Sequence, residues 1–401
     1  MRVYFKRLCT AALLVLALQP LYLLALVATD YVAPVELRHA RMAHLPPPPS
    51  AGDDTIECVA LGIGFEPGGV GLHNAIIAAR PRSEGTPCQS LPAAIAKDPT
   101  VTWWPYPRYW HGYRVVLDPL TAWLPMYPVR YLMLAAMVAA LTWFAFELRS
   151  LLGVDVALAM IVPIVVLTDL WINWNFTAQT LAHVVIFAGS AVVARKARSP
   201  DSNLILTAAL FGSLFNYVDF LVNVPWQPML IAFVALAAGR RVPETLAIVV
   251  AWFAGYSLTW ASKWAIAVAA GTPWSDIFEV ITYRLNGDLP GYVRHHVLAP
   301  TQKVLAYLYH ETRSAMLFLL LVATLLLPVR RWPNPGRFAL LASPLLIPFG
   351  WFELLSNHTQ IHTWMVYRTV ASCFGILIAA AIIASRGEGA DSSIAQQKSA
   401  G

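Results

Sequence analysis

Long apolar segments recur along the chain, and short polar or charged stretches separate them. A helix needs about 20 apolar residues to cross roughly 30 Å of hydrocarbon, and many of these segments approach or exceed that length. We therefore expect an all-α polytopic membrane protein with about ten transmembrane helices. The predicted spans are residues 8–28, 126–147, 154–171, 179–195, 204–221, 227–239, 246–270, 314–328, 338–355 and 369–385.

Two of these spans carry polar or helix-breaking residues. Asn216, Asp219 and Pro225 interrupt the fifth and sixth, a pattern typical of broken or re-entrant segments that line a cavity. The first span has a basic start and is also compatible with a cleaved signal peptide. Its apolar stretch is long for that role and the cleavage pattern near Ala28 is poor, which favours a retained helix.

Arginine and lysine fall on every second connection between the apolar segments. Short basic loops stay on the cytoplasmic side of a membrane, so this alternation predicts cytoplasmic termini. The expected location is a bacterial inner membrane, with the remaining connections and the active site on the periplasmic side. The basic clusters are Arg2/Lys6/Arg7, Arg149, Arg195/Lys196/Arg198, Arg240/Arg241, Arg330/Arg331/Arg337 and Arg386.

Composition agrees with a membrane protein and excludes other classes. Hydrophobic residues make up 58% of the chain and charged residues only 12%, too few to cover a soluble surface of this size. The net charge of +6 comes mostly from the basic clusters, so we do not expect nucleic acid as a partner. No phosphate-binding loop of the GxxxxGK[ST] type occurs, which argues against nucleotide hydrolysis.

Two long connections fall on the predicted periplasmic side, at residues 29–125 and 271–313. Both are far longer than the turns that usually join packed helices, and long loops usually carry function. We treat residues 1–385 as one transmembrane domain that contains these two loops. The polar, small-residue-rich segment 386–401 is predicted to be a disordered cytoplasmic tail.

Four cysteines divide between the spans and one loop. Cys9 and Cys373 lie within spans and are expected to act as small apolar residues. Cys58 and Cys88 both lie in the first loop, where an oxidising compartment favours a disulfide.

The first loop contains a segment rich in aromatic and basic residues, from Trp103 to Arg114. Amphipathic rings of this kind settle at the depth of lipid headgroups, so the segment is compatible with an aromatic belt. If it is helical, Arg108, His111 and Arg114 lie on neighbouring faces and are suited to bind an anion such as phosphate. The chemistry favours neither interpretation over the other.

Cations also lie near the ends of later spans. Lys263, between Trp260 and Trp264, either reaches the interface with its ammonium or binds an anionic group such as a lipid phosphate. His358 and His362 have the spacing of a helical metal pair, but no third ligand is evident. Hydrogen bonding to an anionic headgroup, together with Arg368 at the start of the last span, is the favoured interpretation.

A carboxylate within a membrane span is energetically costly, so its presence indicates a structural or functional role. Asp169 and Asp219 are such residues, although each is also compatible with an interface position. The second loop carries charges that any soluble loop would carry, namely Arg284, Asp288, Arg294, His295, His296 and Lys303.

One reaction class accommodates outward-facing carboxylates, cations near membrane depth and many aromatic rings. In glycosyl transfer from a lipid-linked sugar, cations stabilise the departing phosphate and a carboxylate takes the proton of the acceptor hydroxyl. A transporter would place ionisable groups on paired broken helices near the midplane, and no inverted repeat is evident.

Two motifs add a family resemblance. Arg108-Tyr-Trp-His-Gly-Tyr113 followed by Asp118-Pro-Leu, and Asn357-His with His362, Tyr367 and Arg368, resemble bacterial multi-spanning glycosyltransferases of the GT-C type. The topology is also similar, with a first span, a large outer loop and then many helices. Among these proteins, the chain most resembles those that transfer arabinofuranose to type IV pilins.

The resemblance implies a polyprenyl-phosphate sugar donor and an acidic base in the first outer loop. Asp53 or Asp54 would be that base, and Asp30 is the alternative because the family often places this residue close after the first span. Candidates for binding the donor phosphate are Lys263, Arg368, His358, Arg114 and Arg108. Residues that would form the substrate pocket are Trp110, His111, Tyr113, His362, Tyr367 and Asn357.

The sequence therefore predicts an inverting glycosyltransferase. It would move a pentose such as arabinofuranose, or a hexose, from polyprenyl phosphate to a periplasmic protein, glycan or lipid, among membrane lipids. Some GT-C enzymes need a divalent metal, but the sparse carboxylates favour no metal and no cofactor here. The alternatives are a flippase or transporter for a lipid-linked sugar or envelope lipid, and a structural partner in an envelope-assembly complex.

Overall fold

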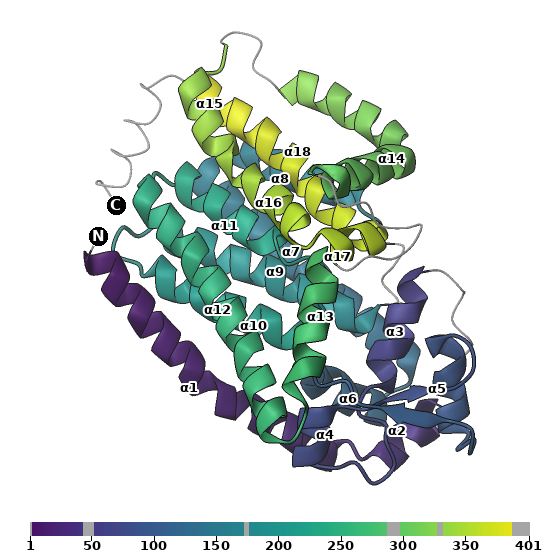
Figure 1. The fold of residues 1–401 in the computed structure, drawn as a ribbon. Coiled ribbons are helices and arrows are strands. Elements are labelled where there is room, and N and C mark those ends of the chain that lie inside the picture. Colours follow the sequence, from purple (N-terminus) through teal and green to yellow (C-terminus); the bar gives the residue numbers. More distant parts are fainter. Residues whose placement is uncertain (1, 43–51, 172–175, 287–296, 327–331, 387–401) are drawn as a thin grey trace.

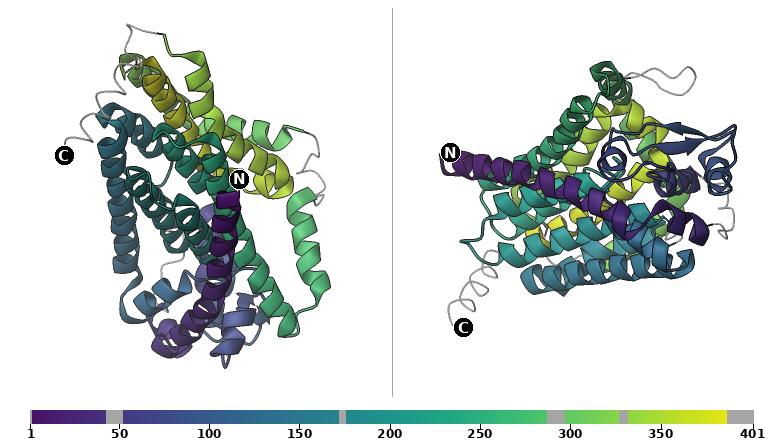
Figure 2. Two further views of the ribbon diagram at one scale, coloured as in Figure 1. Left: turned by 90° about the vertical axis from the view of Figure 1, so that its left-hand side faces the viewer. Right: turned by 90° about the horizontal axis from the view of Figure 1, so that it is seen from below.

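The computed structural model describes residues 2–42, 52–171, 176–286, 297–326 and 332–386. Within these ranges the chain is mostly helical and has only two short strands (Figure 1). Apolar helices pack side by side, and a smaller helical unit, formed by the first predicted loop, lies at one end of them (Figures 1 and 2). The expected all-α class is confirmed.

Six helical segments of the described chain are long and apolar enough to cross a membrane: Val3–Val32, Met126–Leu152, Thr177–Ala197, Val242–Ala269, Pro335–Leu354 and Thr363–Ser385. Three further apolar helices are shorter, which suits segments buried among the others. These properties support a multi-pass membrane protein. The count of about ten spans stays a prediction.

The helices of this bundle follow the predicted segments with some changes of boundary. They are α1 (Arg2–Val32), α7 (Met126–Leu152), α8 (Val154–Leu167), α9 (Thr177–Ala197), α10 (Leu204–Val218), α11 (Trp226–Ala237), α12 (Val242–Ala269), α14 (Ala299–Leu326), α15 (Pro335–Ala342), α16 (Leu346–Leu354) and α18 (Thr363–Ser385).

Two predicted spans differ in the structure. The segment 338–355 is not one straight helix, because a 3₁₀ turn at Ser343–Leu345 separates α15 from α16. Pro344 lies in that turn, where it removes a backbone donor from the helical ladder. The segment 154–171 ends as a helix at Leu167. The predicted interruption between the fifth and sixth spans is present, since α10 ends at Val218 and α11 begins at Trp226.

Close packing of α10 on α12 explains two glycines in the bundle. A Cβ atom at Gly212 would lie 2.0 Å from the Trp252 carbonyl oxygen, and one at Gly255 would lie 2.0 Å from that of Ala209. Each glycine therefore lets the backbone of the other helix approach, as small residues do between membrane helices. α1 packs across this pair, and Gln19 donates to the Thr259 hydroxyl at 3.2 Å.

The basic clusters of the described chain gather at one end of the bundle, and Arg330 and Arg331 lie outside the described residues. Arg386, after α18, binds Asp155 of α8 at 2.6 Å, and Arg240 donates to the carbonyl of Pro200 at 2.8 Å. Arg198, after α9, contacts Glu147 of α7. Each contact links residues in or next to two different loops, or a loop and the end of α18. These loops therefore lie at the same end of the bundle, as the predicted alternation of basic loops requires. The start of α1 lies toward the same end, opposite the small helical unit (Figure 2).

Where it is described, at residues 29–42 and 52–125, the first predicted loop folds as a compact unit, which we call the first excursion. It consists of short helices and one two-stranded antiparallel sheet that pairs Arg80 with Trp104. Its elements are α2 (Val35–Met42), α3 (Gly52–Gly62), α4 (Leu72–Ile77), β1 (Arg80–Arg82), α5 (Pro87–Ile95), β2 (Thr102–Trp104) and α6 (Arg114–Trp123).

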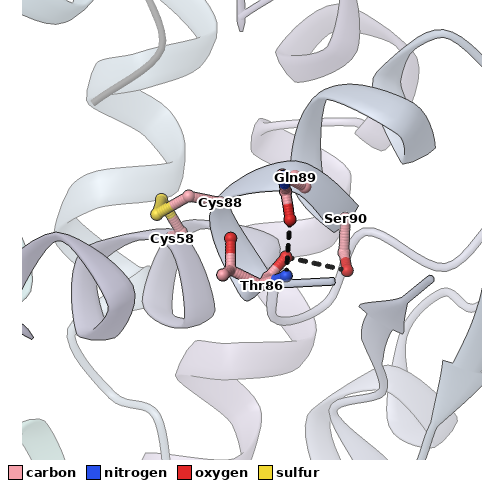
Figure 3. The surroundings of a disulfide bond; sticks show 5 residues. All are labelled: Cys58, Thr86, Cys88, Gln89 and Ser90. Carbon is pink, nitrogen blue, oxygen red and sulfur yellow. Dashed lines mark hydrogen bonds between the residues drawn. A yellow bond between two sulfur atoms is a disulfide. The ribbon is translucent and has the colours of Figure 1, made fainter. Parts of the chain in front are cut away.

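A disulfide between Cys58 and Cys88 joins α3 to α5 (Figure 3). Next to it, the Thr86 backbone N–H donates to the Gln89 side chain at 2.8 Å, and the Ser90 hydroxyl donates to the Thr86 carbonyl at 3.2 Å. These contacts fix the start of α5 where Cys88 lies. The structure thus forms the pair that the sequence predicted.

Glu57 anchors α3 to the bundle and makes the stability of the folded protein depend on pH. The side chain is buried, and its Oε1 accepts hydrogen bonds from the Thr177 hydroxyl at 2.6 Å and from the Thr177 backbone N–H at 3.2 Å. Burial raises the pKa of Glu57 to about 7, against the smaller opposite effect of these hydrogen bonds. The native state therefore holds its proton more tightly than the unfolded chain does.

Stability should consequently fall as pH rises from about 4.5 to 7, because a carboxyl with a raised pKa binds more protons when folded. The Glu57 contribution to this fall is roughly 3 kcal/mol. We expect Glu57→Gln to remove most of it. The measurement is apparent Tm in detergent between pH 5 and 8, with the exposed Glu84→Gln as control. Equal slopes for wild type and Glu57→Gln would contradict the assignment.

The second predicted loop, residues 271–313, is also helical where it is described. It contains α13 (Trp274–Asn286), and its later part belongs to the first turns of α14. The short helix α17 (Ser356–Ile361) packs on α13 and leads into α18. Asn357 of α17 donates to the Tyr283 carbonyl at 2.5 Å, which fixes the end of α13.

Candidate functional site

The aromatic segment of the first excursion is not the helix that would align its basic residues. The described chain forms β2 up to Trp104 and then turns, and α6 begins only at Arg114. His111 has a positive φ of 57°, a conformation that ends any helical path there. The side chains of Arg108 and Arg114 therefore have different environments.

Two aromatic residues of this segment attach the excursion to its neighbours. The Trp110 ring nitrogen donates to the Thr259 carbonyl of α12 at 2.7 Å, and the Tyr113 hydroxyl donates to the Ala60 carbonyl at 2.9 Å. Both side chains are almost completely buried. Both residues hold the excursion against its neighbours, and their predicted role in a substrate pocket stays a prediction.

His111 is buried beside these rings. Its Nε2 lies 3.0 Å from the Tyr106 carbonyl oxygen, to which it donates. Burial lowers the pKa of His111 well below its usual value, and Lys263, Arg114 and Arg108 act in the same direction. The imidazole is therefore neutral and contributes no charge toward an anion.

Asp30 and Arg114 belong to a buried network of ion pairs. One Asp30 oxygen binds Arg114 at 2.7 Å and the Asn74 amide at 2.9 Å, and the other accepts the Gly71 N–H at 2.9 Å. Arg114 also binds Asp118 at 2.9 Å, and Asp118 in turn binds Arg38 at 2.9 Å. Both Asp30 oxygens have partners and are shielded from solvent, so Asp30 helps to hold the excursion in place, and its role as a catalytic base stays a prediction.

The Lys263 side chain does not face open space. Its ammonium is buried and donates to the carbonyls of Ala75 at 2.9 Å and Ile76 at 2.7 Å, at the C-terminal end of α4. The Trp110 ring lies 5.5 Å away. A cation at a helix C-terminus stabilises the exposed carbonyls there. In the structure Lys263 joins α12 to α4, and its predicted role in phosphate binding stays a prediction.

Arg368 is likewise paired within the protein. Its guanidinium forms a two-pronged contact with the Asp169 carboxylate, in which Nη2 lies 2.7 Å from Oδ2. Tyr367 packs its ring against Tyr307, with centroids 5.2 Å apart. The two carboxylate oxygens already occupy the fork that a phosphate would need.

Asp53 and Asp54 lie at the start of α3. Their side chains fall outside the described part of the structure, and so does the proline run 46–49 before them. Their assignment as catalytic base stays a prediction.

A cavity of about 990 Å³ opens where α12 ends, between the first excursion and α13. Most of its lining is apolar or aromatic, and Trp104, Trp264 and Tyr283 contribute rings. Arg108 is the predicted phosphate ligand that lines it, with its guanidinium 4.2 Å from the Tyr106 ring centroid. We call this space the α13 cavity.

Two carboxylates line the same cavity. Asp276 and Glu279 are three residues apart on α13, which places them on neighbouring positions of one helix face. Tyr283 follows four residues after Glu279 on that face. The α13 cavity therefore combines a cation, a carboxylate pair and aromatic rings.

A second cluster of polar side chains lies near the C-terminal end of α13. The Arg284 Nη1 donates to His358 Nδ1 at 3.0 Å and to His362 Nε2 at 3.2 Å. The two imidazole rings come from α17 and its C-cap, with centroids 4.7 Å apart. The predicted neighbouring pair of histidines is present, and an arginine from the second loop lies against both. No group of three metal-binding side chains occurs among the described residues.

Sequence reasoning missed the residues of α13. Asp276, Glu279 and Tyr283 follow helical spacing, but they lie in a stretch whose length and polarity predict a loop. In such a loop Arg284 is one charge among several. Its contact with the histidines joins positions 74 and 78 residues apart, which no local pattern indicates.

Comparison of the chain with known protein families, with curated proteins and with solved structures found no match.

Proposed function

We propose that the protein is a glycosyltransferase that moves a sugar from a polyprenyl phosphate to an acceptor hydroxyl. The donor would carry a pentose or a hexose, and the acceptor would be a protein, glycan or lipid. The proposed location is a bacterial inner membrane, with cytoplasmic termini and the α13 cavity on the periplasmic side. This side follows from the basic clusters, which gather at the opposite end.

The observation that carries this proposal is the composition of the α13 cavity. Its aromatic residues offer flat faces for sugar rings, Arg108 offers a fork for phosphate, and Asp276 and Glu279 offer carboxylates that can accept a proton. The cavity lies directly after α12, where that helix would leave the bilayer. A lipid chain could thus remain in the membrane while its sugar enters the cavity.

The reaction would proceed as a single displacement. The acceptor oxygen forms a bond to the anomeric carbon while the bond from that carbon to the phosphate oxygen breaks. The phosphate leaves with the bonding electrons, and its charge is stabilised by Arg108. The proton of the acceptor hydroxyl goes to Glu279 or Asp276, which replace Asp30 as the candidate base among the described residues.

Arg108 gives the first test of this assignment. A hydrogen bond to a charged group contributes about 1.5–3 kcal/mol, so Arg108→Gln should weaken donor binding by roughly 10- to 100-fold. The measurement uses purified protein in detergent with a short-chain isoprenyl-phosphate pentose or hexose. Binding is followed by calorimetry, and released isoprenyl phosphate by mass spectrometry.

Arg41→Gln is the matched control, because Arg41 is an exposed arginine of the same excursion and does not line the cavity. Unchanged donor binding in Arg108→Gln would remove Arg108 from the site. Donor binding without release, with every acceptor tried, would favour a flippase for the lipid-linked sugar.

A further inference from the structure

Arg284 differs in its partners from six arginines of the described chain that bind carboxylates. Arg38 and Arg114 bind Asp118, and Arg368 binds Asp169. Arg198, Arg240 and Arg386 likewise contact Glu147, Glu244 and Asp155. Arg284 instead contacts two imidazoles, and no carboxylate of the described residues is recorded within ion-pair distance of it. Its positive charge is not balanced within that part of the chain.

The hydrogen bonds fix the protonation of both histidines. His358 Nε2 lies 2.7 Å from the Leu221 carbonyl oxygen and must donate to it, which leaves Nδ1 as the acceptor for Arg284. His362 accepts from Arg284 at Nε2 and therefore carries its proton on Nδ1. Both rings are neutral, so the cluster has a net charge of +1.

Burial lowers the pKa of His362 to about 3, and the neighbouring Arg284 acts in the same direction. Burial also lowers the pKa of His358 well below its usual value, with further lowering by His362 and Arg284. The tautomers inferred from the hydrogen bonds thus persist at physiological pH.

Two donors of this cluster lack a partner among the described residues. They are Arg284 Nε and His362 Nδ1, and both atoms are shielded from solvent. A buried donor without an acceptor costs about 1–3 kcal/mol. The side chains of Arg284 and His362 are only half-buried as a whole, so the cluster borders accessible space. An anion bound there would supply the missing acceptors and balance the charge.

The surroundings hold these groups in place and add positive potential. Asn357 fixes the backbone of Tyr283, and Leu221 fixes the His358 ring. Burial raises the pKa of Tyr109, and Arg284 and Arg108 both oppose this rise. Tyr283, the residue before Arg284 on α13, lines the α13 cavity, so the cluster lies beside that cavity.

We propose that Arg284 and His362, oriented by His358, form a binding site for a phosphate group, with Arg284 Nε and His362 Nδ1 as donors. The guanidinium fork matches phosphate geometry, and a neutral imidazole N–H adds a third directed donor. The phosphate belongs either to a lipid headgroup or to free inorganic phosphate. Only the assignment to a lipid-linked donor rests on the proposed glycosyl transfer.

The test measures binding, which is independent of any transfer reaction. Calorimetry in detergent would follow inorganic phosphate and, separately, a ten-carbon isoprenyl phosphate, for wild type, Arg284→Gln and His362→Leu. We expect Arg284→Gln to weaken binding by roughly 10- to 100-fold. Arg284→Lys keeps the charge without the fork and should bind with intermediate affinity.

The control is Arg149→Gln, which removes an exposed arginine at the other end of the bundle. Loss of binding in Arg284→Gln and His362→Leu, with normal Tm and with binding retained in Arg149→Gln, supports the site. Stronger binding of isoprenyl phosphate indicates a lipid headgroup, and equal binding of both probes indicates a site for phosphate itself. No binding of either probe to wild type, or equal binding to Arg284→Gln, would overturn the proposal.

If Arg284→Gln does not fold, Arg284→Lys and His362→Leu still test the site. Arg284→Lys keeps the His362 donor, and His362→Leu keeps the Arg284 donor. If the phosphate site is confirmed and no sugar is transferred, the proposed reaction fails while this site stands.

Discussion

Replacement of Asp118 by asparagine is expected to destabilise the first excursion by about 3–5 kcal/mol. Asp118 is the only carboxylate recorded within ion-pair distance of Arg38 in the described chain, and it also binds Arg114. The Arg38 side chain has no exposed surface, so its charge would remain buried without compensation. Arg114 keeps Asp30 as a partner. The loss of stability should therefore come mainly from the unpaired charge of Arg38.

Thermal unfolding in detergent, followed by tryptophan fluorescence, measures this effect. Apparent Tm should fall by on the order of 5 °C or more. The exposed Asp98→Asn is the control and should change stability by less than about 0.5 kcal/mol. The double variant Arg38→Leu/Asp118→Leu removes both charges and should recover part of the loss. If Asp118→Asn unfolds at the wild-type temperature, the network does not hold the excursion.

Removal of both carboxylates from the α13 cavity is expected to lower the rate of glycosyl transfer by roughly 10²- to 10⁴-fold, the usual contribution of general base catalysis. Asp276→Asn and Glu279→Gln keep the size of each side chain and remove its basicity. If one residue is the base, its single variant should show nearly the whole loss, and the other variant much less.

The donor should still bind to these variants, because Arg108 and the aromatic rings are unchanged. A loss in rate with donor affinity preserved separates a base from a binding residue. Glu84→Gln is the matched control, since Glu84 is exposed in the first excursion and does not line the cavity. A double variant that transfers sugar at the wild-type rate would exclude both residues and return attention to Asp53 and Asp54.

The sequence was sufficient to predict features that depend on local pattern. Apolar length predicted the long helices, and Asp219 with Pro225 predicted the break between α10 and α11. Two cysteines in one loop with a predicted periplasmic location predicted the Cys58–Cys88 pair. Each of these features depends on residues within one segment, or on the general rule that disulfides form in oxidising compartments.

The roles of individual cations could not be predicted in the same way. Lys263 binds carbonyls of α4, 187 and 188 residues earlier, and Arg368 binds a carboxylate 199 residues away. Whether a cation is free for a ligand depends on which carbonyl or carboxylate the fold brings to it. Arg108 and Arg284 emerge as candidates because their described surroundings do not pair them with a carboxylate.

The most direct test of the proposed function counts both products of one reaction. Purified wild-type protein, a short-chain isoprenyl-phosphate sugar and candidate acceptors would be incubated together, and mass spectrometry would quantify isoprenyl phosphate and glycosylated acceptor. We predict that both form in equal amounts, only when acceptor is present, and that both are lost in the Asp276→Asn/Glu279→Gln variant. A donor that binds to the wild-type protein but stays intact with every acceptor would contradict glycosyl transfer.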